Sequence, residues 1–183
     1  MMQLKLFELF DTDKTLKELN ILFGEQSVIK FSNSIIGITY DYSTNNYIKV
    51  LQKVKDLNMR QVIVTSSVFL NVIDYSVKHD LFINDLKFIY PISKEKISYV
   101  DKYIELINST SGLEKDSYKT KLLKEIDWII SDKSIDIKNI TIQMQNDDSP
   151  IYYNFELYNN GVLLIDDDSI LMSATNLMNN ILS

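Results

Sequence analysis

The sequence predicts an α/β fold: a small parallel βαβαβ sheet, then a helical hairpin, then a C-terminal antiparallel β-meander with a last helix. Three observations lead to this prediction. Short apolar runs alternate with amphipathic segments between Ile35 and Tyr90. Two long stretches of helical periodicity follow, separated by a short polar break. Beyond them, apolar and polar residues alternate on both sides of an Asn-Asn-Gly turn.

The parallel sheet is predicted from three strands, at 35–40, 61–65 and 86–90. The first two are apolar on both faces, which is typical of strands covered on both sides, as in parallel sheets. The intervening segments 47–57 and 67–77 carry apolar side chains at helical spacing. A strand, a helix and a second strand in the same sheet form a right-handed crossover by default, which predicts parallel neighbours.

The next expectations concern residues 1–31, which precede this sheet. Periodicity does not decide whether residues 1–10 form a strand or a helix. A helix is expected to begin near Thr12 or Asp13 and to stop at Gly24, and residues 28–31 are expected to form a hairpin with the strand at 35–40.

Two antiparallel helices are expected after Ser93 and after Ser111, because apolar residues recur at helical spacing on each side of a short break. The meander is predicted from alternating strands around 140–145, 152–158 and 162–165. A final helix follows an acidic triplet. The chain of 183 residues fits one domain, 1–183, with a possible subdivision into 1–131 and 132–183.

Composition limits the function. The net charge is −6 and Arg60 is the only arginine, so nucleic-acid binding is not expected, because it needs many cationic groups facing phosphates. The absence of cysteine excludes disulfides and thiolate metal sites, and it agrees with a cytoplasmic location. We expect no leader peptide and no membrane helix, since no apolar run approaches about 20 residues. The abundance of Ile, Asn and Lys suggests a low-GC bacterium, its phages or its mobile elements.

The polar residues at the expected strand ends suggest phosphate chemistry. Asp41 and Ser43 follow the first strand, and Thr65 and Ser66 follow the second. The carboxyl ends of parallel strands meet at one edge, where a carboxylate and hydroxyls hold phosphate and Mg²⁺. The run from Thr39 to Ser43 resembles the haloacid dehalogenase-type phosphohydrolases, which have Asp-x-Asp-x-Thr after the first strand and Ser or Thr after the next.

This resemblance implies a Mg²⁺-dependent phosphohydrolase or nuclease in which Asp41 binds the metal and Thr65 or Ser66 binds phosphate. The family's nucleophile falls on Thr39, which is not a carboxylate, so the covalent aspartyl-phosphate route is closed. Asp166 and Asp168 would supply the later acidic motif and complete the metal site. An acidic cluster before a helix also serves as a cap, so both interpretations of the triplet stay open.

The strand at 152–158 suggests a contact surface. Tyr152, Asn154, Glu156 and Tyr158 share the face opposite Phe155. Tyrosine suits interfaces because it buries a large area while its hydroxyl keeps a polar contact. The leading hypothesis is therefore a non-catalytic interaction protein, an accessory or inhibitor that binds a protein partner or itself. The alternatives are the Mg²⁺-dependent enzyme and an acidic surface that imitates nucleic acid.

Overall fold

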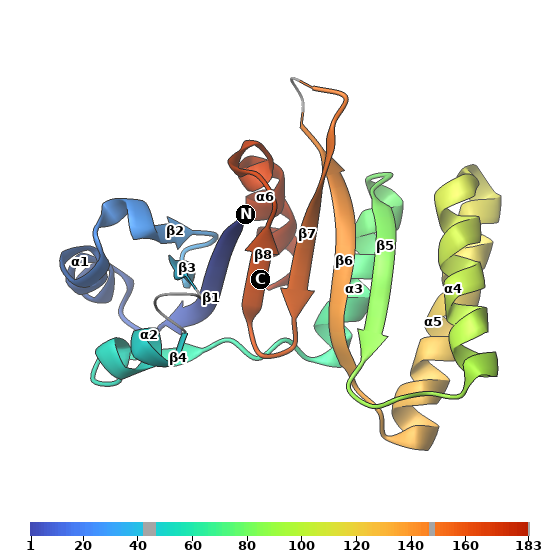
Figure 1. Ribbon diagram of the computed structural model, residues 1–183, viewed down its shortest axis with the longest axis horizontal. Coiled ribbons are helices and arrows are strands. Elements are labelled where there is room, and N and C mark those ends of the chain that lie inside the picture. Colours follow the sequence, from blue (N-terminus) through green and yellow to red (C-terminus); the bar gives the residue numbers. More distant parts are fainter. Residues whose placement is uncertain (42–46, 147–148, 183) are drawn as a thin grey trace. The chain divides into compact units, whose positions relative to one another are not determined.

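The computed structural model describes residues 1–41, 47–146 and 149–182, which form two compact units (Figure 1). Unit 1 comprises Met1–Ile63 and Asn160–Ser183, and unit 2 comprises Val64–Asn159. The helices are α1 (Thr12–Phe23), α2 (Tyr47–Val54), α3 (Ser66–Lys78), α4 (Lys94–Ser109), α5 (Gly112–Lys133) and α6 (Leu171–Ile181). The strands are β1 (Met2–Leu9), β2 (Val28–Lys30), β3 (Ile35–Thr39), β4 (Met59–Gln61), β5 (Phe82–Phe88), β6 (Ile137–Gln145), β7 (Tyr152–Tyr158) and β8 (Val162–Ile165).

The strands of unit 1 are arranged around β1. Their order is β2-β3-β1-β8, and β4 also pairs with the C-terminal end of β1. All of these pairings are antiparallel; Leu6 lies opposite Gly37 of β3, and Leu4 lies opposite Leu163 of β8. The residues of β1 from Leu4 to Phe7 are buried on both faces, so the strand that periodicity could not assign is the centre of the unit.

The predicted parallel βαβαβ sheet is therefore wrong, although the mixed α/β class is correct. The expected strand at 35–40 is β3, but it does not neighbour the next strand along the chain, because β1 lies between β3 and β4. The expected strand at 61–65 is reduced to β4, and Val62 and Val64 are buried outside any strand. The third, at 86–90, is β5, which belongs to unit 2 and is antiparallel to β6.

Unit 2 contains a three-stranded antiparallel sheet in the order β7-β6-β5. Its apolar side chains lie on the face against which α3 packs: Ile83, Leu86, Ile140, Ile142, Phe155 and Leu157. The two helices predicted after Ser93 and Ser111 are confirmed as α4 and α5, which contact each other along their length. The boundary of the possible subdivision, between residues 131 and 132, lies inside unit 2, in the last turn of α5.

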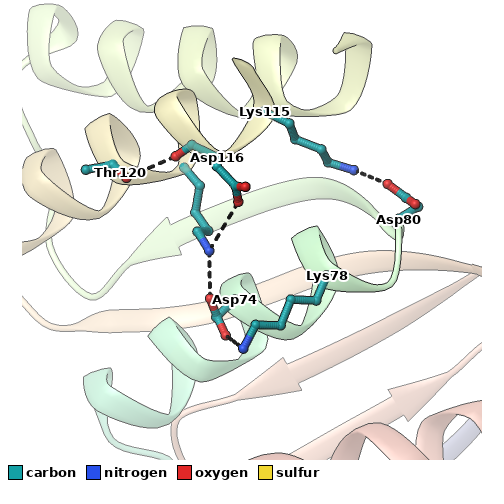
Figure 2. A network of polar contacts seen from close by, with 7 residues as sticks. Asp74, Lys78, Asp80, Lys115, Asp116 and Thr120 are labelled. Atoms are coloured by element: carbon teal, nitrogen blue, oxygen red, sulfur yellow. Dashed lines mark hydrogen bonds and ion pairs between the residues drawn. The ribbon is translucent and has the colours of Figure 1, made fainter. Parts of the chain in front are cut away.

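Ion pairs join α5 to α3 (Figure 2). Asp74 Oδ1 accepts from Lys119 at 2.8 Å and its other oxygen pairs with Lys78 at 2.6 Å, while Lys115 donates to Asp80 at 2.7 Å. Hydrogen bonds from Lys119 and then Lys78 hold the pKa of Asp74 below its usual value. Because each lysine of this network has a carboxylate partner, the network fixes the two helices rather than offering a free charge. No helix within the described residues has the length and apolar character required to cross a membrane.

Candidate functional site

The face of the unit 2 sheet opposite α3 gathers polar and aromatic side chains from three strands. The registers align Lys87 with Asn139 and Tyr158, and they align Asp85 with Thr141 and Glu156. We call this surface the open face. Its members are Phe82, Asp85, Lys87, Asn139, Thr141, Gln143, Gln145, Tyr152, Asn154, Glu156 and Tyr158. Within the described residues 64–146 and 149–159 no helix covers it, as Figure 1 shows with α3 behind β5 and β6.

An aromatic pair stands at one end of the open face. The rings of Phe82 and Tyr152 come from the two outer strands, with centroids 5.8 Å apart and planes at 82°. Such an edge-to-face arrangement is favourable because the positive ring edge meets the negative ring face. Phe82 is nevertheless 40% exposed and Tyr152 is 48% exposed. Two large rings that are ordered against each other but still accessible to solvent are suited to contact another molecule.

The side chains in the middle of the open face are polar, and several of them bond to one another. Asn139 is 1% exposed and its Nδ2 donates to Glu156 Oε1 at 2.7 Å, while Lys87 pairs with Asp85 at 2.8 Å. Hydrogen bonding and charge from Asp85, with a smaller effect of Glu156, raise the pKa of Lys87. The Oδ1 of Asn139 accepts no hydrogen bond from the described residues. This acceptor is buried in the sheet, out of reach of a partner that binds the face as it stands.

Comparison of the chain with protein-family models, with curated proteins and with solved structures finds no match.

All four residues proposed from the sequence as an interface, Tyr152, Asn154, Glu156 and Tyr158, lie on the open face. Sequence reasoning missed the contribution of β5, above all Phe82. The signal was weak because the β5–β6 register shifts between Ile83 and Asp85, so the alternation of the strand is broken in the sequence. Thr141, Gln143 and Gln145 of β6 supply the central row, in which Thr141 is buried and Gln145 is exposed.

The residues of the enzyme alternative are divided between the units. Asp41 is exposed at the end of β3 in unit 1 and lines a cavity of about 400 Å³ with Lys49 and Lys53. The hydroxyl of Thr39 donates to the Ser27 carbonyl at 3.3 Å. Ser43 lies outside the described residues. The parallel crossover that would have joined Asp41 to the hydroxyls of the next strand is not present.

The hydroxyls themselves belong to unit 2, where they begin a helix. Thr65 is the N-cap residue of α3, and its Oγ1 lies 2.8 Å from the hydroxyl of Ser67. Ser66 donates to Asp136 Oδ1 at 2.9 Å. The hydroxyls of Thr65 and Ser66 thus bond to the side chains of Ser67 and Asp136, and the Thr65 side chain makes no capping hydrogen bond to α3.

The acidic triplet precedes the last helix of unit 1. Asp167 accepts from the backbone N–H of Ser169 at 3.0 Å, and hydrogen bonding from the side chain and then the backbone of Ser169 lowers the pKa of Asp167. Asp166 and Asp168 follow β8, whereas Asp41 follows β3, and β1 lies between these two strands. Strand spacing places the backbones of β3 and β8 about 10 Å apart. Among the described residues no three acidic or histidine side chains form a group that would hold a metal ion.

Proposed function

We propose that the protein is a non-catalytic interaction protein that binds a protein partner through the open face. One observation carries the proposal: the exposed, mutually ordered pair of Phe82 and Tyr152 on a sheet face that no helix of its unit covers. Aromatic side chains contribute much of the binding energy of an interface when a partner excludes water from them. The polar row beside them supplies orientation through hydrogen bonds.

The size of the open face limits the kind of complex. Three strands at about 4.8 Å spacing and about seven residues long give a flat area of about 300 Å². A stable complex buries about 800 Å² on each partner. The open face by itself therefore supports a transient complex, as expected of an accessory or inhibitor, and a permanent subunit contact would need further surface.

Site-specific photo-crosslinking tests this proposal. A benzophenone amino acid replaces Tyr152 in one variant and Tyr99 in the other, and both proteins are produced in cells of a low-GC bacterium. Tyr99 is the matched control because it is an exposed tyrosine, 39% accessible, on α4 outside the open face. We expect a discrete adduct at position 152 that is absent at position 99.

The mass of the adduct separates the two kinds of partner, because a second copy of the chain doubles the mass and another protein gives a different increment. Equal adducts at both positions, or none at position 152, would refute the proposal.

A further inference from the structure

The turn that precedes β8 contains the one asparagine of the sequence that is followed by glycine, Asn160 before Gly161. Asparagine deamidates most readily before glycine, because no side chain then keeps the glycine nitrogen away from the asparagine amide. The fold itself requires this glycine, since its φ is +71° and a Cβ there would overlap the Val62 carbonyl. Asn160 is exposed, so water reaches its amide. Both residues belong to unit 1, so this turn is separate from the open face.

The side-chain amide of Asn160 is the electrophile of deamidation, and the fold polarises it. Its Oδ1 accepts from the backbone N–H of Val162 at 3.1 Å. This hydrogen bond forms an Asx turn, in which the side chain folds back over its own following peptide. The ring that the bond closes contains both the amide carbon Cγ and the Gly161 nitrogen. When that nitrogen adds to Cγ, the negative charge that develops on Oδ1 is stabilised by the Val162 N–H.

The Gly161 nitrogen is the nucleophile, and a buried cation holds the carbonyl of its peptide. Lys5 Nζ donates to the main-chain carbonyl oxygen of Asn160, and Lys5 is 2% exposed. Burial lowers the pKa of Lys5 to about 8, so its charged form still prevails at neutral pH. When the Gly161 N–H loses its proton, resonance places part of the negative charge on that carbonyl oxygen. The ammonium of Lys5 therefore makes the Gly161 N–H more acidic.

We propose that Asn160 is a self-modification site, which converts to isoaspartate in the folded chain and gives Lys5 a carboxylate partner. In the first step a solvent base takes the proton of the Gly161 nitrogen, this nitrogen bonds to Cγ of Asn160, and Nδ2 leaves as ammonia with a proton from water. In the second step water adds to the main-chain carbonyl carbon of the succinimide ring, and the bond from that carbon to the Gly161 nitrogen breaks. One water molecule is consumed and one ammonia is released.

The position of Lys5 selects between the two products of ring opening. Water attack at the main-chain carbonyl carbon leaves a free carboxylate there and gives isoaspartate, whereas attack at Cγ gives aspartate. The charged donor Lys5 polarises the main-chain carbonyl more strongly than the neutral N–H of Val162 polarises Cγ. The new carboxylate also forms at the carbon whose oxygen Lys5 already contacts. Isoaspartate lengthens the backbone by one methylene, which falls in the turn and outside β8.

The rate of conversion tests the role of the fold. The full chain is incubated at neutral pH, folded or unfolded in urea, and mass spectrometry follows the gain of mass as NH is replaced by O at residue 160. We expect the folded chain to react about tenfold faster than the unfolded chain. Lys5→Met should slow the folded chain by about tenfold, and Lys30→Met, an exposed control in β2, should stay within about twofold. A folded chain no faster than the unfolded chain, or an unchanged rate for Lys5→Met, would overturn the proposal.

The identity of the product is a second measurement, which needs no variant at position 5. Electron-transfer fragmentation separates isoaspartate from aspartate, and we expect their ratio to be about threefold higher from folded than from unfolded chain. Side-chain NMR of Lys5 should show a higher pKa in the isoaspartate product than in the unmodified chain. Asn160→Asp is the matched control, because it adds the same charge but keeps the main-chain carbonyl, and it should raise the pKa of Lys5 less. Equal product ratios from the two states, or an unchanged pKa of Lys5 in the product, would show that Lys5 does not direct the reaction.

Discussion

Lys5 gives a pH-dependent stability that can be calculated from its position. It lies in the middle of β1, opposite Ile38 and Val162, and is 2% exposed. Its Nζ donates to the carbonyl of Asn160, and no carboxylate pairs with it among the described residues. Burial lowers the pKa of Lys5 from 10.5 to about 8, because the charged form is poorly solvated there.

The sign follows from the protons bound in each state. Between pH 8 and 10.5 the unfolded chain keeps the proton on Lys5 while the folded chain releases it. The folded state therefore gains stability as pH rises through this window. Linkage gives a gain of about 1.3 kcal/mol between pH 7 and 9, and about 2.5 kcal/mol between pH 7 and 10.

The assay is urea unfolding at pH 7, 9 and 10 of the wild-type chain, of Lys5→Met and of Lys30→Met. Methionine keeps the length of the side chain and removes its proton, so the difference between wild type and Lys5→Met isolates this one group. Lys30 is exposed in β2 and controls for the loss of a positive charge. We expect the free energy of unfolding of the wild type, relative to that of Lys5→Met, to rise with pH by the amounts above. Relative to Lys30→Met, it should show no such rise. A difference in the free energy of unfolding between wild type and Lys5→Met that is constant with pH would refute the burial of Lys5 without a carboxylate partner.

Two further predictions concern packing within each unit. Lys119→Met removes the link from α5 to Asp74 and should lower the free energy of unfolding by about 1 kcal/mol at pH 7. This loss should disappear as pH falls below 3.8 through the lowered pKa of Asp74, whereas Lys124→Met, which removes an exposed lysine of α5, should have little effect at any pH. Gly161→Ala should be more destabilising than Gly24→Ala by about 2 kcal/mol, as measured by urea unfolding; both glycines have positive φ, but only at Gly161 would a Cβ overlap a backbone carbonyl. Equal losses would show that the close approach around Gly161 is absent.

Local patterns predicted the elements of this chain far better than their pairing. The helical periodicity that marks α3 to α6 and the alternation that marks β7 arise from neighbours within a few residues. Pairing is not local. β3 is buried on both faces. Such an apolar run is typical of a strand in a parallel sheet, but an antiparallel strand in the middle of a sheet gives the same run. The position of β1 between β3 and β4 decides the topology, and its own pattern was ambiguous.

The distinction between local patterns and strand pairing applies to the candidate site as well. The four residues of β7 were predictable because an uninterrupted strand alternates strictly. Phe82 was not predictable, because the register shift after Ile83 breaks the alternation of side chains between the two faces of β5. The grouping of Asp41 with Thr65 followed from the parallel crossover and was lost with it. The position of β5 at the end of the strand order is likewise a property of strand pairing, which no local pattern contains.

The most direct test of the open face is the affinity of the partner captured by crosslinking at position 152, measured by calorimetry with purified proteins. The wild-type chain, the variant carrying both Phe82→Ser and Tyr152→Ser, and the control Tyr99→Ser are compared. Removal of two aromatic contacts from the interface should weaken binding by about 30-fold or more, and the control should stay within about twofold. Equal affinity of the double variant and the wild type would contradict a binding role for this surface.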